Sequence, residues 1–429
     1  MQLKTSQRIS RVWRSQSPTS KVGLATIVVT SLFVMPLTRD IVASASPTAS
    51  HTASGLHVLA INGARYGVHA PIHVLTFNGS QYSLAIDLAN HEIDGGLETP
   101  SSMCRSTVGC VAAVNGDFYD VTRKGKADPG DEVGGIIQNC VLLHTPEISH
   151  QQVDLAGLQV NTGLNWSVGV NVNGVTVPIT AVNQELPMRY SNVNLHLAGT
   201  LLFTSAYALR LPVAVGRVTY EFIVVNGTTS PTTTFPTTIP TTTIPTPTST
   251  TSTTIVSPTA ISPTTINTTV QLELVGQTTN AVRVHAGHVD ISAPTGSSFA
   301  SLQVGGTVAM TTNSSAGCNN IGGHPILLED GAVVPISSAD TYMAQRYART
   351  VIGWMGSGET VIMIVGGIDD KSGATGNQLD RLLRSLHVVT ALDLDGGDST
   401  ALYVNGRIYY HAGRAERPVS TGLLVVRNH

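Results

Sequence analysis

Two carboxylates, a hydroxyl and two glycines lie together near the C-terminal end of the sequence. The run Asp395-Gly396-Gly397-Asp398-Ser399 follows a short apolar segment, 391–394, and precedes a second one, 401–404. Glycine lets a backbone approach a ligand closely, and consecutive N–H groups in such a turn can hold an anion. The pattern indicates an acidic loop between two strands, which could do chemistry. A solvated hairpin turn is the alternative for these residues taken alone.

A second aspartate follows an apolar run in the first half of the sequence. The stretch VAAVNGDFY places Asn115 and Asp117 at the end of a predicted strand, with a glycine between them. Because two predicted strands each present an aspartate beside glycine, we expect the two loops to share a pocket. The C-terminal acidic loop is not an EF-hand, because the twelfth place counted from Asp393 is Val404 rather than glutamate.

The N-terminus has the pattern of a secretory signal peptide. Basic residues precede an apolar run at 22–37, and small residues follow at 43–45. The run is short for a membrane span, so cleavage near Ala45 is favoured over a retained anchor. We therefore expect 1–45 to be a signal peptide and the protein to be secreted or held at the cell surface, with no membrane contact beyond this segment.

Charge and cysteine content narrow the class of protein further. Only 12% of residues are charged, the net charge is −3, and no basic tract follows the signal region. Nucleic acid is therefore not an expected partner. Four cysteines in an oxidising compartment permit two disulfides. Cys104–Cys110 is the natural local bridge, which leaves Cys140–Cys318, although the sequence does not fix this connectivity and four buried thiols are the alternative.

The chain reads as strands interrupted by a biased tract. Alternating apolar and polar residues predict many β-strands between Asn-Gly turns, whereas 228–268 is almost wholly threonine, proline and serine. The tract could link two domains, but both of its flanks have strand patterns. Loop closure costs grow only logarithmically with length. We therefore predict one discontinuous domain, 55–227 and 269–429, interrupted by a disordered insertion.

One helix is predicted with a clear apolar face. In the stretch 377–386, leucines recur at spacings of three and four, which is the period of an amphipathic helix. The predicted fold class is therefore α+β, with a strand-rich mixed sheet and few helices.

Six motifs in a fixed order resemble the phosphodiester glycosidase family. They are AVNGDFYD at 112–120, GGHPILLEDG at 322–331, RTVIG at 349–353, the helix, ALDLDGGDSTALYVNG at 391–406 and ERPVSTGLLV at 416–425. The resemblance implies a single α+β unit with motifs on both sides of the Thr/Pro tract. The chain departs from the family pattern at Asp117 and Asp398, where the family has glycine.

The resemblance also implies a set of pocket residues. Asp395 is the first choice for the catalytic carboxylate and Glu416 the second, while Arg349 and Arg417 suit phosphate oxygens. The other expected substrate-binding residues are Asn115, Asp117, His324, Gly396, Gly397, Ser399. Glu416 could instead form an ion pair with Arg417, and His324 could be a loop histidine bonded to the backbone.

No cofactor is assigned, and the one candidate is a divalent cation. Asp117 and Asp398 together could hold calcium through hard oxygen ligands, although no spacing rule supports the pair.

The sequence therefore predicts a secreted hydrolase that cleaves a sugar-1-phosphodiester or a related glycan linkage, at the cell surface or in cell-wall or exopolysaccharide material. Its expected partner is a carbohydrate or sugar-phosphate substrate. The alternative is a non-catalytic glycan- or metal-binding surface protein on the same scaffold.

Overall fold

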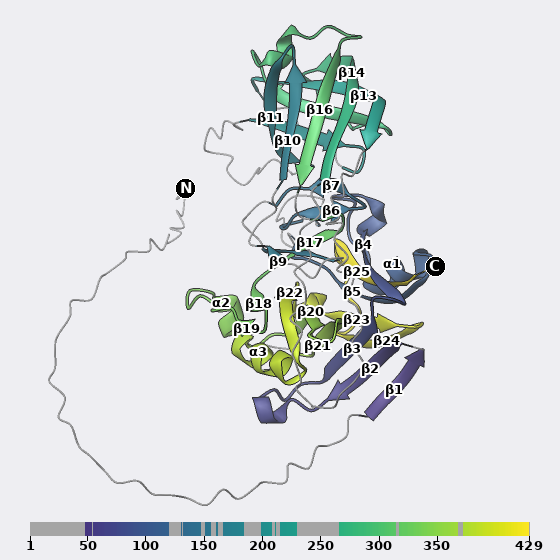
Figure 1. The fold of residues 1–429 in the computed structure, drawn as a ribbon, viewed down its shortest axis with the longest axis vertical. Coiled ribbons are helices and arrows are strands. Elements are labelled where there is room, and N and C mark those ends of the chain that lie inside the picture. The colour runs from purple at the N-terminus through teal and green to yellow at the C-terminus, as the bar shows by residue number, and fades with distance from the viewer. Residues whose placement is uncertain are drawn as a thin grey trace, which may run out of the picture. The chain divides into compact units, whose positions relative to one another are not determined.

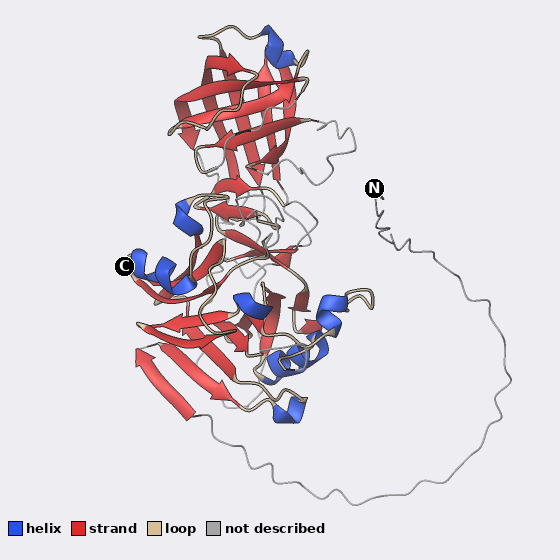
Figure 2. Ribbon diagram, turned by 180° about the vertical axis from the view of Figure 1, so that it is seen from behind, coloured by secondary structure: helices blue, strands red, loops and turns tan. Residues whose placement is uncertain are grey.

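The computed structural model (Figure 1) describes 48–53, 55–119, 130, 132–146, 151–155, 160–161, 166–183, 199–207, 211, 215–229, 266–314, 317–367 and 372–428. The predicted signal peptide and most of the Thr/Pro tract lie outside these residues. Strands dominate the described chain and helices are few and short, as Figure 2 shows. The α+β, strand-rich fold class is confirmed.

The largest sheet has eight strands, and every neighbouring pair in it is antiparallel. In spatial order its strands are β1 (Thr48–Ala53), β2 (Leu56–Ile61), β3 (Ile72–Asn78), β21 (Glu359–Val365), β20 (Arg349–Met355), β22 (Val388–Asp393), β18 (Ile326–Glu329), β19 (Ala332–Val333). Segments from both ends of the chain therefore meet in one sheet.

Two five-stranded sheets complete the part of the fold that carries the motifs. The first has the order β24 (Arg407–His411), β23 (Ala401–Val404), β5 (Cys110–Asn115), β25 (Thr421–Arg427), β4 (Tyr82–Leu88). The second has the order β7 (Val141–His144), β6 (Ile136–Gln138), β17 (Asn320–Gly323), β8 (Gln151–Asp154), β9 (Val160–Asn161). The predicted acidic strands, β5 and β22, thus belong to different sheets.

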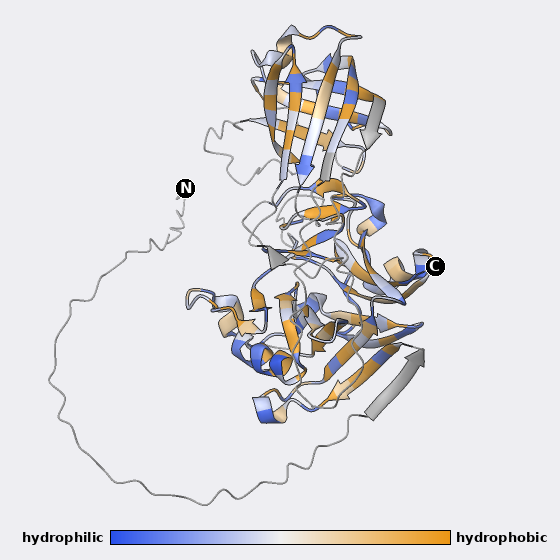
Figure 3. Ribbon diagram, in the orientation of Figure 1, coloured by the Kyte–Doolittle hydropathy of each residue, from blue (hydrophilic) through white to orange (hydrophobic). Residues whose placement is uncertain are grey.

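Seven further strands close into a barrel, which the sequence did not predict. They run in the order β10 (Trp166–Val172), β11 (Val175–Val182), β12 (Thr200–Thr204), β15 (His288–Pro294), β13 (Arg217–Thr229), β14 (Ile266–Thr278), β16 (Thr307–Ser314). Among them β11 and β12 are parallel, and the other pairs are antiparallel. Apolar and polar residues alternate along these strands, as Figure 3 shows, so one face of each strand fills the barrel.

The strands that flank the Thr/Pro tract pair with each other. The antiparallel ladder between β13 and β14 extends to the pair Thr229 and Thr268. The tract therefore joins the ends of a hairpin rather than two unconnected elements. The division into one discontinuous domain stays a prediction.

Three α-helices lie in the described chain: α1 (Pro100–Ser106), α2 (Thr341–Ala344), α3 (Gly376–Ser385). The predicted amphipathic helix is confirmed as α3, shifted by one residue. Thr375 and Gln378 form a capping box at its N-terminus, in which each side chain bonds the other residue's backbone. Leu379, Leu382 and Leu383 are fully buried. No helix in the described part of the chain is long and apolar enough to cross a membrane.

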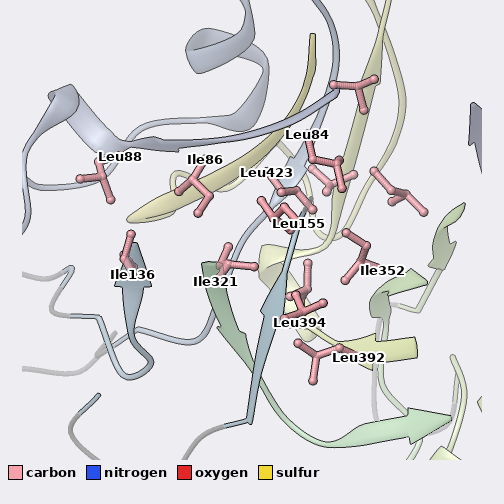
Figure 4. Close-up of a cluster of buried hydrophobic side chains, with 14 of the residues drawn as sticks. Leu84, Ile86, Leu88, Ile136, Leu155, Ile321, Ile352, Leu392, Leu394 and Leu423 are labelled. Atoms are coloured by element: carbon pink, nitrogen blue, oxygen red, sulfur yellow. The ribbon is translucent and has the colours of Figure 1, made fainter. Parts of the chain in front are cut away.

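A shared apolar core holds the motif-bearing sheets together. Figure 4 shows leucine and isoleucine side chains from several sheets converging, with Ile86 and Leu423 from one sheet, Ile321 from another, and Leu392 from the largest. Leu392 and Leu394 are fully buried immediately before the acidic loop. Their burial fixes where that loop leaves the core.

Both disulfides have the predicted pairing. Cys104 is bonded to Cys110, and Cys140 is bonded to Cys318. The second bridge joins the points at which the chain approaches and leaves the barrel, since all barrel strands lie between these two cysteines. Two such bridges are compatible with an extracellular protein.

Candidate functional site

The two acidic loops foreseen from the sequence are joined by hydrogen bonds. Asn115, at the end of β5, donates from Nδ2 to the backbone oxygen of Asp395 at 2.6 Å, and the Asp395 N–H donates to the Gly116 oxygen at 3.1 Å. Thr350 Oγ1 donates to Asn115 Oδ1 at 2.7 Å. Asn115 is fully buried, so its side chain positions the Asp395 loop and does not face solvent.

Asp395 is a partly exposed carboxylate whose neighbours perturb its protonation. Burial raises the pKa of Asp395 to about 6, while Ser399, the Gly396 N–H and the positive charge of Arg417 act to lower it and Asp117 acts to raise it. The Gly396 N–H donates to Asp395 Oδ1 at 2.8 Å. Asp395 therefore combines access to solvent with a pKa close to neutral pH, which suits acid–base or nucleophilic chemistry.

Asp117 is buried beside two glycines. It is 1% exposed, and its Oδ1 accepts a hydrogen bond from the Phe118 N–H at 2.7 Å. A Cβ added to Gly134 or Gly322 would lie 1.8 or 1.9 Å from Asp117 Oδ2. The carboxylate therefore occupies space that exists only because both neighbours are glycine.

Glycines also shape the acidic loop itself. A Cβ on Gly396 would lie 2.5 Å from both the Ala348 oxygen and the Tyr342 hydroxyl oxygen, and Gly397 has a φ of 58°. Ser399 is buried in the short turn that follows. Gly396, Gly397 and Ser399 thus define the shape of the loop around Asp395.

Asp398 is exposed, whereas Asp395 is partly exposed and Asp117 is buried. The charge of Asp398 raises the pKa of Tyr410, and the charge of Asp117 raises the pKa of Asp395. Within the described residues, neither Asp117 nor Asp398 belongs to a convergent group of three or more metal-ligating side chains. Calcium binding by this pair stays a prediction.

Arg349 is completely buried and its donors are all engaged. Its guanidinium forms an ion pair with Asp393 at 3.0 Å and donates to the backbone oxygens of Ala374, Tyr342 and Gln345 and to the sulfur of Met343. The guanidinium carbon of Arg349 also lies 4.1 Å from the centre of the Tyr342 ring. These contacts give Arg349 a structural position beneath the loop rather than an open one facing a phosphate.

The ion-pair partner of Arg349 is equally enclosed. Asp393 ends β22 and is fully buried. Burial raises the pKa of Asp393, while Arg349 acts to lower it.

Arg417 is partly exposed and lies on the Asp395 side of the site. Its guanidinium carbon is 5.9 Å from the centre of the Tyr119 ring, and the Tyr119 hydroxyl donates to the Pro418 oxygen at 3.1 Å. Arg417 is therefore the better placed of the two predicted arginines to meet an anionic substrate.

Glu416 caps a helix. Its carboxylate accepts hydrogen bonds from the Ser101 N–H, at 2.9 Å, and from the Ser101 hydroxyl, at the start of α1. A carboxylate at a helix N-terminus is stabilised by the unpaired N–H groups there. Glu416 therefore makes a structural contact with α1, and its predicted catalytic role stays a prediction.

His324 links two elements near the acidic strand. Its N–H donates to the Asp393 oxygen at 2.8 Å, and its ring nitrogens lie 3.1 Å from Gln151 Oε1 and 2.8 Å from Asp340 Oδ2. Asp340 in turn caps α2 by accepting from the Met343 N–H. The imidazole thus contacts two side chains rather than the backbone, and substrate binding by His324 stays a prediction.

Tyr342 was not among the residues predicted for the site. Its hydroxyl is buried against Gly396, and its ring stacks on Tyr347 at 5.3 Å and meets Phe118 edge-on at 5.6 Å. Burial raises the pKa of Tyr342 well above its ordinary value. No motif surrounds this tyrosine, so only the three-dimensional packing shows that it backs the acidic loop.

Comparison with known families identifies the segment that carries most of these residues. Residues 260–426 match the model of the phosphodiester glycosidase family. The predicted family resemblance is confirmed. The matched segment includes His324, Arg349, Asp395 and Arg417, whereas Asn115 and the rest of the β5 loop precede it.

Solved structures share the fold at low sequence identity. A hypothetical protein from Synechocystis superposes with a TM-score of 0.62 and 17% identity, over 89% of this chain and 64% of that one. A protein from Burkholderia pseudomallei gives 0.57 and 15%, over 83% and 74%. The chain thus spans less than two thirds of the Synechocystis protein.

The zebrafish N-acetylglucosamine-1-phosphodiester alpha-N-acetylglucosaminidase catalytic domain gives a TM-score of 0.37 and 13% identity, over 89% of this chain and 82% of that one. No curated protein matches the chain.

Proposed function

We propose that this protein is a secreted hydrolase that cleaves the bond between the anomeric carbon of a sugar and a phosphodiester oxygen, with Asp395 as the catalytic carboxylate. The observation that carries the proposal is the position of Asp395, a partly exposed carboxylate on a glycine-shaped loop whose pKa is raised to about 6. The family match supports the reaction class. The two disulfides support an oxidising location.

The substrate anion needs a cation at the mouth of the site. Arg349 has its donors engaged in the interior, whereas Arg417 is partly exposed and its charge acts on Asp395. Arg417 is therefore the residue that would hold the phosphate oxygens beside the carboxylate. Asn115 and Tyr342 would position the loop without touching the substrate.

The leaving group simplifies the chemistry. A departing phosphate is a weak base, since the second pKa of a phosphate monoester is about 6. It therefore requires little help from a general acid. The remaining demand is for a carboxylate that stabilises or attacks the oxocarbenium-like centre, or that activates water. In the overall reaction water adds a hydroxyl to the anomeric carbon and a proton to the phosphate product.

The direct test follows the oxygen of water. The purified protein is incubated with a panel of sugar-1-phosphodiesters, including N-acetylglucosamine conjugates, in ¹⁸O-labelled water, and the products are read by mass spectrometry. Label in the released sugar is the expected result. Label in the phosphate would replace the proposal with phosphodiesterase chemistry, and the absence of either product with and without calcium would favour a non-catalytic glycan-binding protein.

A further inference from the structure

A cluster of metal-ligating side chains lies on the barrel, apart from the acidic loop. Glu221 of β13, His285 and His288 place their ligand atoms within 4.8 Å of one another. The Nδ1 atoms of His285 and His288 lie 2.6 and 2.7 Å from the same carboxylate oxygen, Glu221 Oε1. Two imidazoles and a carboxylate that converge on one point form a ligand set typical of zinc.

The backbone explains why these side chains meet. In the antiparallel ladder Glu221 is directly opposite Asp290, and His288 is two residues before Asp290 on β15. Residues two apart on a strand share a face, and directly opposed residues are neighbours. Glu221, Asp290 and His288 therefore occupy one face, whereas Phe222 and Val289 belong to the apolar barrel cluster. The His288 N–H donates to the His285 oxygen at 3.0 Å, which closes a turn that brings the second ring alongside.

Asp290 supplies an independent reason to expect a ligand. It is 2% exposed, and its Oδ1 is buried without a hydrogen-bond partner in the described structure. Its carboxylate interacts electrostatically with Glu221, His285 and His288. A buried carboxylate that lacks a bond is costly unless a cation or donor completes it.

We propose that Glu221, His285 and His288 bind a transition-metal ion of the zinc class, with Asp290 as a supporting carboxylate outside the set of ligands. Tetrahedral zinc at ~2.0–2.1 Å from its ligands requires ligand atoms roughly 3.3 Å apart. The distances of 2.6 and 2.7 Å from Glu221 Oε1 to the two imidazole nitrogens are shorter than this by about 0.6–0.7 Å, so small side-chain rotations open the site. Imidazole nitrogen excludes calcium as the preferred ion.

The bound ion would fasten the β14–β15 connection to β13. His285 lies in that connection, with 69% of its side chain exposed, whereas Glu221 is 28% exposed and set within the barrel wall. An ion shared between them cross-links the loop to the wall. This site is independent of the proposed hydrolysis, because none of its residues belongs to the acidic-loop site.

The test uses the full chain without an affinity tag, because a histidine tag would bind zinc itself. Zn²⁺ is titrated into metal-free protein by calorimetry, and Co²⁺ is titrated in parallel to read the visible absorption of a four-coordinate ion. We expect one strong Zn²⁺ equivalent in the wild type and its loss in His285→Ala/His288→Ala. Asp290→Asn should weaken binding about 10–100-fold, as expected for a supporting carboxylate.

The matched control is His69→Ala, which removes an exposed histidine elsewhere. It should bind like the wild type, and metal-free melting curves of all variants show whether each is folded. Wild-type binding no stronger than that of the double variant would overturn the site. Unchanged affinity in Asp290→Asn would overturn the supporting role of Asp290.

Discussion

The floor and the rim of the acidic-loop site contrast in how their charges are held. The floor, formed by Asn115, Arg349 and Asp393, is fully buried, and its side chains bond to backbone and to neighbouring side chains. The rim, formed by Asp395 and Arg417, is partly exposed, and its charges act on each other. An aspartate and an arginine are therefore buried and stabilise the fold in the floor, whereas an aspartate and an arginine in the rim are accessible to a ligand.

A residue's place in a family motif therefore does not show whether it can react with a ligand or only stabilises the residues that do. Arg349 and Arg417 both lie in family motifs, but five hydrogen bonds occupy Arg349 while Arg417 keeps solvent access. A substitution in the floor should therefore change folding stability first. One in the rim should change turnover first.

The largest effect is expected at the rim carboxylate. Asp395→Asn removes the group that would stabilise or attack the anomeric centre, so kcat for sugar-1-phosphodiester hydrolysis should fall by about 10³-fold or more. The fold should persist, because the amide keeps the shape of the side chain. Asp330→Asn, at an exposed turn away from the site, is the matched control and should retain wild-type turnover. Full activity in Asp395→Asn would remove Asp395 from the mechanism.

The next effect is expected in the floor. Arg349→Met leaves the buried Asp393 carboxylate without its cation, and such a loss costs about 3–5 kcal/mol of unfolding free energy. Urea denaturation measures it. Adding Asp393→Asn should recover part of the loss, because the uncompensated charge is then gone. Arg417→Met should cost less than about 1 kcal/mol, and equal losses at the two arginines would contradict the distinction between floor and rim.

A smaller effect is expected where Asp117 meets glycine. Gly322→Ala puts a methyl group 1.9 Å from Asp117 Oδ2, so the carboxylate or the strand must move, at about 1–3 kcal/mol. Because the Asp117 charge acts on Asp395, turnover should fall as well. Gly79→Ala is the control, since a Cβ there meets nothing within 4 Å. A Gly322→Ala protein with unchanged stability and turnover would show that the position of Asp117 is unimportant.

Much of this arrangement was predictable because it depends on local chemistry. The strand that ends at Asn115, the strand just before Asp395 and the leucine-faced helix follow from spacing and turn residues. The compartment made two disulfides an expectation, and the short spacing of Cys104 and Cys110 favoured the observed pairing without fixing it. The sequence also placed the two acidic loops together, and hydrogen bonds between Asn115 and Asp395 join them.

The remainder depends on long-range packing that spacing does not encode. Closure of the barrel requires β10 to pair with β16, about 140 residues later in the chain. The structural contacts of Glu416 depend on Ser101, which is 315 residues away. Likewise, the enclosure of Arg349 by Tyr342 and Met343 is visible only once α2 is folded against the sheet.

The smallest and most specific effect concerns pH. Asp395 has a pKa raised to about 6 by burial, so the reactive carboxylate forms as pH rises through about 6 and is lost as pH falls below it. The profile of kcat/KM should therefore have an acid limb near pH 6. Arg417→Gln removes a positive charge that lowers the pKa of Asp395, so the limb should move to higher pH.

The same profile separates this role from its rival. Arg414→Gln changes an exposed arginine in the same loop and should leave the limb in place, which shows whether a shift is specific to Arg417. If Asp395 acted as a general acid, activity would instead fall as pH rises through its pKa. An activity that falls as pH rises through about 6 would mean that Asp395 is needed in its protonated form. An acid limb that does not move to higher pH in Arg417→Gln would mean that the charge of Arg417 does not lower the pKa of Asp395.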